Sequence, residues 1–121
     1  MKEDNIIRTK SYKFALKIVA LYKNIVFTRK EFVLSKQILR SGTSIGANIE
    51  EAIGAQSKKD FIARLSIAYR ESRETSYWLR TLKDTGYINT QTANEMGTEC
   101  AEITKILSKI LLTMKKQTSN S

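Results

Sequence analysis

The third quarter of this sequence carries a row of cations interrupted by one aromatic ring. Arg70, Arg73, Tyr77 and Arg80 follow one another at spacings of three, four and three residues. On an α-helix such residues share one side, and Lys59 lies roughly in register with them earlier in the same segment. Cations in a row can bind successive phosphates, and a ring between them can stack on a base. The pattern predicts a surface for a polyanion such as nucleic acid.

A second group of basic residues lies near the N-terminus. Lys10, Lys13 and Lys17 are spaced as neighbours along one flank of a helix. Residues 1–30 hold eight basic and two acidic residues, so most of the net charge of +9 lies there, with a smaller excess in residues 58–88. A strongly basic balance favours a polyanionic partner. We therefore include these three lysines in the predicted binding surface.

The basic residues allow two interpretations. The first is a surface that binds RNA or DNA mainly through phosphates, because the chain contains no recognised motif for reading base sequence. The second is ordinary solvated charge on the outside of a helical protein, which Glu71 and Glu74 could partly neutralise. The net charge of +9 favours the first interpretation.

Catalytic chemistry finds little support in the sequence. The chain has no histidine, which is the commonest general base and transition-metal ligand. Its single cysteine, Cys100, lies in an apolar row and is predicted to be a small buried hydrophobe. Its glutamates lie beside the apolar rows rather than in them, unlike the inward Glu-x-x-His pairs of di-iron bundles. We expect no catalytic residue, no cofactor and no metal, and a metal-dependent bundle enzyme is the weakest alternative.

Four rows of apolar residues at alternating spacings of three and four indicate the helices that must position these side chains. The predicted helices cover about residues 11–27, 30–53, 58–85 and 90–115, and a polar tail follows at 117–121. The rows, which include a few small or polar residues, are Phe14, Ile18, Leu21 and Ile25; Ile38, Gly42, Ile45, Ile49 and Ala52; Phe61, Leu65, Ala68, Ser72, Thr75, Leu79 and Leu82; and Ala93, Met96, Cys100, Ile103, Leu107, Ile110 and Met114. The sequence thus predicts one all-α domain over residues 1–121, an antiparallel up-down-up-down four-helix bundle.

Local signals mark the ends of these helices. Thr28-Arg-Lys-Glu31 and Ser57-Lys-Lys-Asp60 both have the spacing of a helix N-terminal cap. Gly86 follows the third helix, where a left-handed glycine commonly ends a helix. Gly42 and Gly46 are four residues apart on one face, which predicts that another helix approaches closely there.

Compartment and solubility can also be predicted from the sequence. The N-terminal residues contain no apolar segment typical of a secretory signal. The longest uncharged run with apolar character lies between Arg40 and Glu50, far short of the roughly 20 residues that a membrane span needs. A single cysteine permits no disulfide within the chain and fits a reducing compartment. We expect a soluble, cytoplasmic protein with no membrane partner.

Three segments also carry a family resemblance. They read LSKQILRSGTSIGANIEEA at 34–52, QSKKDF at 56–61 and ESRETSYWL at 71–79. Together they resemble the small bundle proteins encoded in intervening sequences of bacterial 23S rRNA genes, a family similar to the accessory bundle proteins of diversity-generating retroelements. The resemblance implies an antiparallel four-helix bundle that assembles into a barrel-like homopentamer. It brings no established catalytic residues.

Two functional hypotheses follow from the charge and the resemblance. The first is a non-enzymatic, homo-oligomeric bundle that binds RNA or DNA through phosphates, because the retroelement accessory proteins bind nucleic acid. The alternative is a protein-interaction scaffold, an accessory subunit that docks a partner such as a reverse transcriptase. A ring of subunits would repeat any basic face and amplify weak phosphate contacts.

Overall fold

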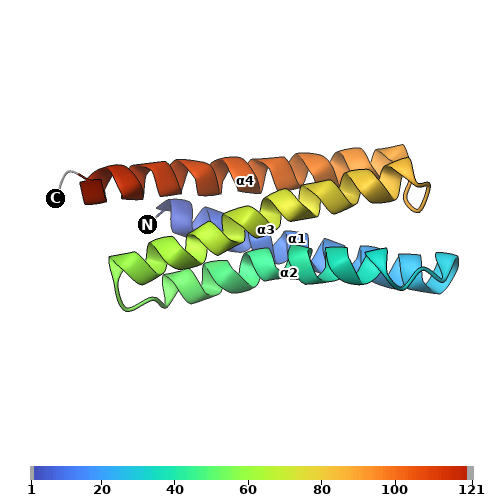
Figure 1. The fold of residues 1–121 in the computed structure, drawn as a ribbon, viewed down its shortest axis with the longest axis horizontal. Helices are drawn as coiled ribbons and strands as arrows, with labels where there is room; N and C mark the ends of the chain where they lie inside the picture. Colours follow the sequence, from blue (N-terminus) through green and yellow to red (C-terminus); the bar gives the residue numbers. More distant parts are fainter. Residues whose placement is uncertain (1, 120–121) are drawn as a thin grey trace.

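The computed structural model describes residues 2–119 of the chain, with the side chains of residues 6–117, and within that range the fold is all-α. Four α-helices and one π-helical turn occur there: α1 (Lys2–Asn24), η1 (Ile25–Arg29), α2 (Leu34–Ile53), α3 (Lys58–Asp84) and α4 (Thr90–Ser119). Each helix packs on the next one along the chain, while α1 and α4 touch less extensively. Short connections at alternate ends reverse the direction each time, as in an up-down bundle (Figure 1).

The first and last helices are longer than predicted. α1 begins at Lys2 rather than near Ser11. The apolar row in fact starts at Ile7, which is buried, and Ser11 takes the next core position, where its hydroxyl donates to the carbonyl oxygen of Arg8. Because Ser11 is polar, the apolar pattern in the sequence did not extend back to Ile7, and the first turns of α1 were not predicted. α4 continues to Ser119 because no proline or glycine follows Gly97 to stop it. The predicted polar tail is therefore helical as far as Ser119, and its last two residues lie outside the described residues.

The connection between α1 and α2 differs from the predicted capping box. Thr28 does not cap α2, since its hydroxyl donates to the carbonyl oxygen of Asn24 within the preceding turn. Lys30 adopts a left-handed conformation with φ of 54° and ends that turn. The Glu31 carboxylate then accepts hydrogen bonds from the backbone N–H groups of Leu34 and Ser35, both at 2.8 Å. α2 consequently begins at Leu34 rather than residue 30, because a glutamate side chain reaches across the first turn to satisfy its free donors.

The other two connections follow the predicted chemistry. The Ser57 hydroxyl accepts a hydrogen bond from the backbone N–H of Asp60 at 3.1 Å, which confirms the cap of α3. Gly86 has φ of +82°. The backbone N–H groups of Gly86 and Tyr87 donate to the carbonyl oxygens of Lys83 and Leu82, the paired bonds of a Schellman motif. These bonds fix the turn that brings α4 back along α3.

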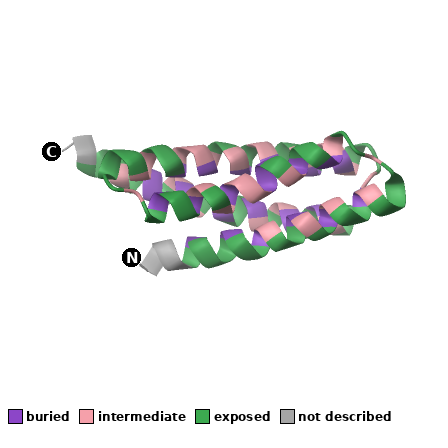
Figure 2. Ribbon diagram, turned by 90° about the horizontal axis from the view of Figure 1, so that it is seen from below, coloured by how far each residue is buried: buried purple, intermediate pink, exposed green. Residues whose placement is uncertain are grey.

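The core contains nearly all of the predicted apolar rows (Figure 2). Phe61 and Met114, at two ends of the rows, are only partly buried. Gly42 lets α1 approach α2 as predicted, because a Cβ atom there would lie 2.7 Å from Cγ1 of Ile18, whose side chain is fully buried. A Cβ on Gly46 would lie 3.4 Å from the carbonyl oxygen of Ser11. These two glycines set the spacing between α1 and α2.

A layer of hydroxyl groups crosses the middle of the core. The hydroxyls of Ser41 and Thr75 hydrogen-bond between α2 and α3 at 2.9 Å, and those of Ser72 and Thr104 do so between α3 and α4 at 2.8 Å. Every buried side-chain oxygen or nitrogen in the described part of the chain has a partner, so this layer does not cost unpaired polar groups. Over the same residues, no helix is long and apolar enough to cross a membrane.

Candidate nucleic-acid interface

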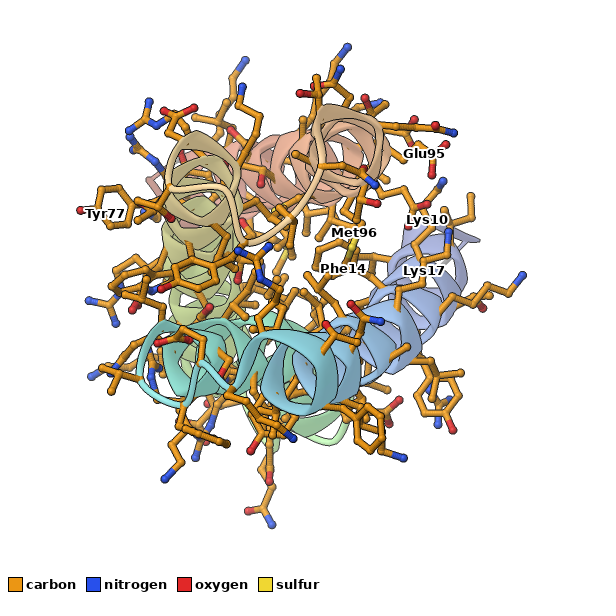
Figure 3. The ribbon with its side chains drawn as sticks, turned by 90° about the vertical axis from the view of Figure 1, so that its right-hand side faces the viewer. Lys10, Phe14, Lys17, Tyr77, Glu95 and Met96 are labelled. Atoms are coloured by element: carbon orange, nitrogen blue, oxygen red, sulfur yellow. The ribbon has the colours of Figure 1, made fainter. Side chains whose placement is uncertain are left out.

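The lysines of α1 face acidic residues of α4. The Lys10 Nζ atom lies 3.2 Å from Oε2 of Glu102, and Lys17 pairs with Glu99. Figure 3 shows Lys10 and Lys17 extending from α1 on the side where α4 runs. We call these two ion pairs the α1–α4 strip. Both pairs are exposed to solvent, so each is worth under about 1 kcal/mol and neutralises charge more than it stabilises the fold.

The two other predicted lysines lie apart from the strip and from the arginines. Lys13 lies on the outer side of α1, beside Arg8 and Tyr12. Lys59 is exposed in the first turn of α3. A helix rises about 1.5 Å per residue, so Lys59 is roughly 16 Å along α3 from Arg70. The structure therefore does not gather the predicted site residues into one surface.

The arginines of α3 line a groove against α4. Arg73, Tyr77 and Arg80 line one hollow, and Arg70 lines a second hollow that shares Tyr69 and Ser108 with the first. We call the two together the α3–α4 groove. The remaining lining residues come from both helices: Ala63, Ser66, Ile67, Glu74, Ser76, Ala101, Thr104, Lys105, Leu111, Leu112 and Lys115.

The two acidic residues of α3 that could neutralise this groove, Glu71 and Glu74, form ion pairs with α2 instead. The Arg40 guanidinium of α2 lies 3.1 Å from Oε2 of Glu71 and 2.5 Å from Oε1 of Glu74. The hydrogen bond from Arg40 and a second from the indole N–H of Trp78 lower the pKa of Glu74. The same pairing with Glu74 raises the pKa of Arg40. Both carboxylates are therefore compensated by α2 instead of by the arginines of α3.

Two of the three groove arginines, Arg73 and Arg80, contact aromatic rings. Within the described residues, Arg70, Arg73 and Arg80 have no carboxylate within ion-pair distance. The guanidinium carbon of Arg73 lies 6.0 Å from the ring centre of Tyr69, and that of Arg80 lies 5.9 Å from the ring centre of Tyr77. A cation over a ring is attracted to it but keeps its charge. The groove is a cationic surface with two aromatic rings in it.

Three charged or aromatic groove residues were missed by the sequence analysis. Lys105 and Lys115 line the groove from α4, and Tyr69 lines both of its hollows. The turn at Gly86 makes α3 and α4 antiparallel neighbours, so residues at similar distances from it lie side by side. That relation would have placed Lys105 opposite residue 67, beside the stretch that holds Tyr69 and Arg70. Tyr69 is partly buried, packed against the core beside the groove.

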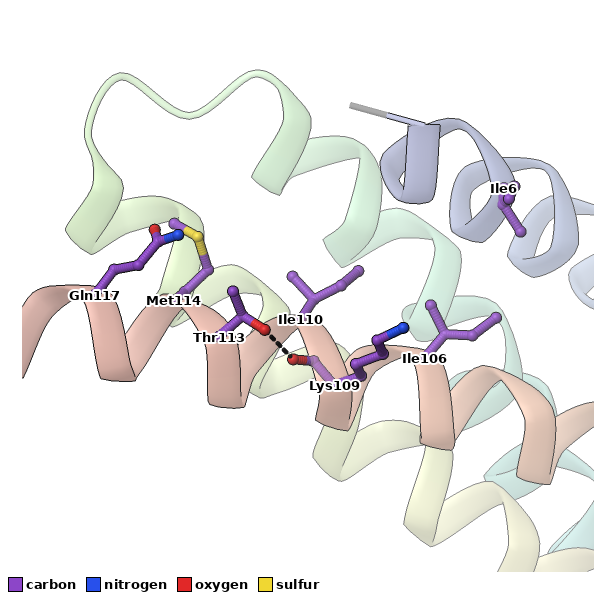
Figure 4. A pocket seen from close by; sticks show the side chains of 7 residues that line it. All are labelled: Ile6, Ile106, Lys109, Ile110, Thr113, Met114 and Gln117. Atoms are coloured by element: carbon purple, nitrogen blue, oxygen red, sulfur yellow. Dashed lines mark hydrogen bonds between the residues drawn. The ribbon is translucent and has the colours of Figure 1, made fainter.

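A separate hollow, between α1 and α4, is lined mainly by apolar side chains, unlike the cationic α3–α4 groove (Figure 4). It has a volume of 330 Å³ and is lined by Ile6, Ile106, Ile110 and other residues, with Lys109 as the single cation among them. The hydroxyl of Thr113 at its edge donates to the carbonyl oxygen of Lys109. An apolar lining with one cation does not suit a polyanion.

Cys100 is buried, as predicted. Its thiol donates to the carbonyl oxygen of Ser72 at 3.1 Å, and burial raises its pKa to about 11. The thiolate is the reactive form of cysteine, so this side chain is inert at neutral pH. No cluster of three or more metal-ligating side chains occurs in the part of the chain that the structure describes.

Comparison with known proteins supplies the family. The family model for 23S rRNA-intervening sequence proteins matches residues 3–109. The chain belongs to this family. A similar solved structure is that of a protein of unknown function from the S23 ribosomal protein family of Bacteroides thetaiotaomicron. It is 52% identical, with a TM-score of 0.89, over 90% of this chain and 97% of that one. A search of curated proteins finds no match.

Proposed function

We propose that this family member is a non-enzymatic, cytoplasmic bundle that binds RNA or DNA mainly through phosphates, along the α3–α4 groove. The observation that carries the proposal is the separation of charge around α3. Arg40 compensates Glu71 and Glu74, while the groove arginines keep their charge facing solvent. Exposed cations without acidic partners are what phosphate binding requires.

The number of cations predicts the salt dependence of binding. Five cations line the groove: Arg70, Arg73, Arg80, Lys105 and Lys115. Each phosphate that is neutralised contributes about 0.7 to the log–log salt slope for a single strand and about 0.9 for a duplex. Five contacts per subunit would give a slope of about −3.5 for a single strand and about −4.5 for a duplex, which is a steep dependence at physiological salt.

We also propose that the protein acts as a homo-oligomer, with the homopentamer of its relatives as the expected form. The family resemblance supports this assembly. Repetition of the groove in a ring would let one nucleic acid bind several weak sites at once, and linked sites raise overall affinity without any new contact. Light scattering of the purified protein would measure its mass with and without nucleic acid.

The decisive test is a comparison of two charge-reversal variants. Arg70→Glu, Arg73→Glu and Arg80→Glu together should weaken binding of labelled RNA and DNA at least about a hundredfold and flatten the salt slope. The matched control reverses Lys10, Lys13 and Lys17 to Glu, which should have a smaller effect on binding. Lys10 and Lys17 already pair with acids, and Lys13 lies on the outer side of α1, away from the groove. Circular dichroism checks that both variants fold. Equal losses in the two variants would remove the groove from the proposal, and no binding by the folded wild-type oligomer would remove the function.

A protein-interaction scaffold is the second candidate function. The observation that favours it is an exposed apolar corner between α1 and α2, where Phe27 is 76% exposed, Phe32 50% and Val33 71%. Large exposed apolar groups gathered in one place commonly mark a protein contact. A reverse transcriptase is the partner class that the family resemblance implies.

The scaffold function has a separate test. A tagged protein should retain its partner after nuclease treatment, and Phe27→Ser with Phe32→Ser should release it while leaving nucleic-acid affinity unchanged. Loss of every copurifying protein upon nuclease treatment of the wild type would eliminate this candidate. The same variant with its nucleic-acid affinity lost would place nucleic-acid binding at the corner instead.

A further inference from the structure

Of the two aromatic rings in the groove, that of Tyr77 is exposed to solvent while that of Tyr69 packs against the core. Tyr77 is 51% exposed and projects from α3 away from the bundle axis (Figure 3). Its hydroxyl makes no hydrogen bond to any described residue. Its ring is nevertheless held in place, with an edge contact to Trp78 at 5.0 Å between ring centres and the Arg80 guanidinium 5.9 Å away. A fixed, half-exposed ring between cations is a surface ready to stack on another flat group.

From this geometry we propose that the α3–α4 groove selects single-stranded nucleic acid over duplex, with Tyr77 as a platform on which a base stacks. The inference rests on the proposed function and adds to it the form of the ligand. In a duplex, the base faces are hidden in the helical stack, so only phosphates and base edges are within reach. An unpaired strand offers both a base face to the ring and phosphates to Arg73 and Arg80.

The rest of the groove fits the same ligand. Its lining also carries the hydroxyls of Ser76 and Ser108, which can hydrogen-bond to sugars and phosphates. Leu112, which is 68% exposed, lies in the continuation of the groove beside Arg70. Apolar groups next to cations suit a strand that presents bases and phosphates alternately, whereas a duplex presents a nearly continuous anionic surface.

The experiment compares three ligands of equal length, about ten nucleotides, with the whole protein at one salt concentration. They are an unpaired oligomer, its duplex, and an unpaired abasic oligomer that retains only sugars and phosphates. Tyr77→Leu should weaken binding of the unpaired oligomer about tenfold, the range of one lost base stack, and should leave the abasic oligomer and the duplex within about twofold. Tyr77→Phe should retain wild-type affinity, because the ring is kept.

Tyr12→Leu is the matched control. Tyr12 is also exposed, at 63%, but it lies on α1 away from the groove, so its removal should change none of the three affinities. Repeating the series with RNA and DNA separates a contribution of the 2′-hydroxyl from stacking, because stacking is common to both. Tyr77→Leu should also leave the salt slope unchanged, since it removes no cation.

Two different results would overturn two different claims. If the unpaired oligomer and the duplex bind wild type equally and Tyr77→Leu matches Tyr12→Leu, the stacking platform is wrong while phosphate binding stands. If none of the three ligands binds even at low salt, the proposed function itself fails. A loss for Tyr77→Phe equal to that for Tyr77→Leu would assign the effect to the hydroxyl and also contradict stacking.

Discussion

The α1–α4 strip and the α3–α4 groove are both built from basic residues at helical spacing, yet they differ in what faces them. Lys10 and Lys17 meet Glu102 and Glu99 across the bundle. The arginines of α3 meet α4 where it presents Thr104, Lys105 and Ser108, which carry no negative charge. Cationic rows on α1 and α3 therefore have opposite electrostatic roles, one neutralised within the fold and one directed at solvent.

The difference teaches that a basic row becomes a candidate binding surface only when the neighbouring helix leaves its charge uncompensated. On α3 this depends on a third helix. Glu71 and Glu74 lie in the same stretch of sequence as the arginines, but Arg40 of α2 binds both carboxylates. The positions of these residues in the sequence do not predict which cation pairs with each carboxylate.

The largest expected effect comes from displacing α1, which would break the strip without touching the groove. Gly42→Val should lower the free energy of unfolding by about 3 kcal/mol, because its side chain would overlap the buried Ile18. Urea denaturation measures the loss. Gly97→Ala is the matched control, since nothing lies within 4 Å of a Cβ there; it should stabilise α4 by up to about 1 kcal/mol. Equal stability for wild type and Gly42→Val would contradict the close approach of α1 and α2.

Removing Arg40 should leave the arginines of the groove partly neutralised by nearby acids, as the lysines of the strip are. Arg40→Gln frees Glu71 and Glu74 to neutralise the nearby arginines, so nucleic-acid affinity should fall about tenfold, equivalent to about 1.4 kcal/mol. The pKa of Glu74 should also rise, since the hydrogen bond from Arg40 is the main cause of its lowering. Fluorescence anisotropy measures the affinity, and NMR titration follows the carboxyl group.

A rescue variant controls for indirect effects of losing Arg40. Glu71→Gln and Glu74→Gln, added to Arg40→Gln, remove the freed charges and should restore affinity to at least the wild-type value. Failure of the rescue, with the variant folded, would show that Arg40 affects binding by some means other than holding these two carboxylates.

Removing the Glu31 cap, in the connection between α1 and α2, should have a smaller and pH-dependent effect on the free energy of unfolding. Burial raises the pKa of Glu31, but hydrogen bonds from the backbone of Leu34, Ser35 and Val33 outweigh it and lower the pKa below its ordinary value of 4.5. The carboxylate therefore stabilises the fold fully above pH 4.5, and this contribution is lost as the pH falls through the lower folded value. Glu31→Ala should cost about 1 kcal/mol at pH 7. The difference from wild type in urea denaturation should shrink at acid pH, and a constant difference would contradict the cap.

The smallest expected effect is that of breaking one pair of the strip. Lys17→Gln and Glu99→Gln, alone and combined, should show a coupling energy below about 0.5 kcal/mol in a double-mutant cycle, because the pair is exposed and screened. Thermal unfolding at low and high salt measures it. A coupling above about 2 kcal/mol would mean that the strip holds the bundle together rather than merely neutralising it.

Much of the fold was predictable because helical periodicity is local. The apolar rows, the Ser57 cap, the left-handed Gly86 and the small residue at Gly42 each depend on a few neighbours in sequence. The errors have local causes too. A serine at a core position hid the start of α1, and a left-handed Lys30 moved the start of α2 so that Glu31, not Thr28, caps it.

The sequence by itself determined that this protein forms amphipathic helices with an excess of positive charge, because periodicity and composition are properties of the chain. Only the tertiary structure decided which cations are paired. It joined Lys17 to Glu99 and Arg40 to Glu74, and it opened Arg73 and Arg80 toward Lys105 across the groove. The physical reason is that ion pairing falls off over a few ångströms, and the two ion-paired partners lie 82 and 34 positions apart in sequence.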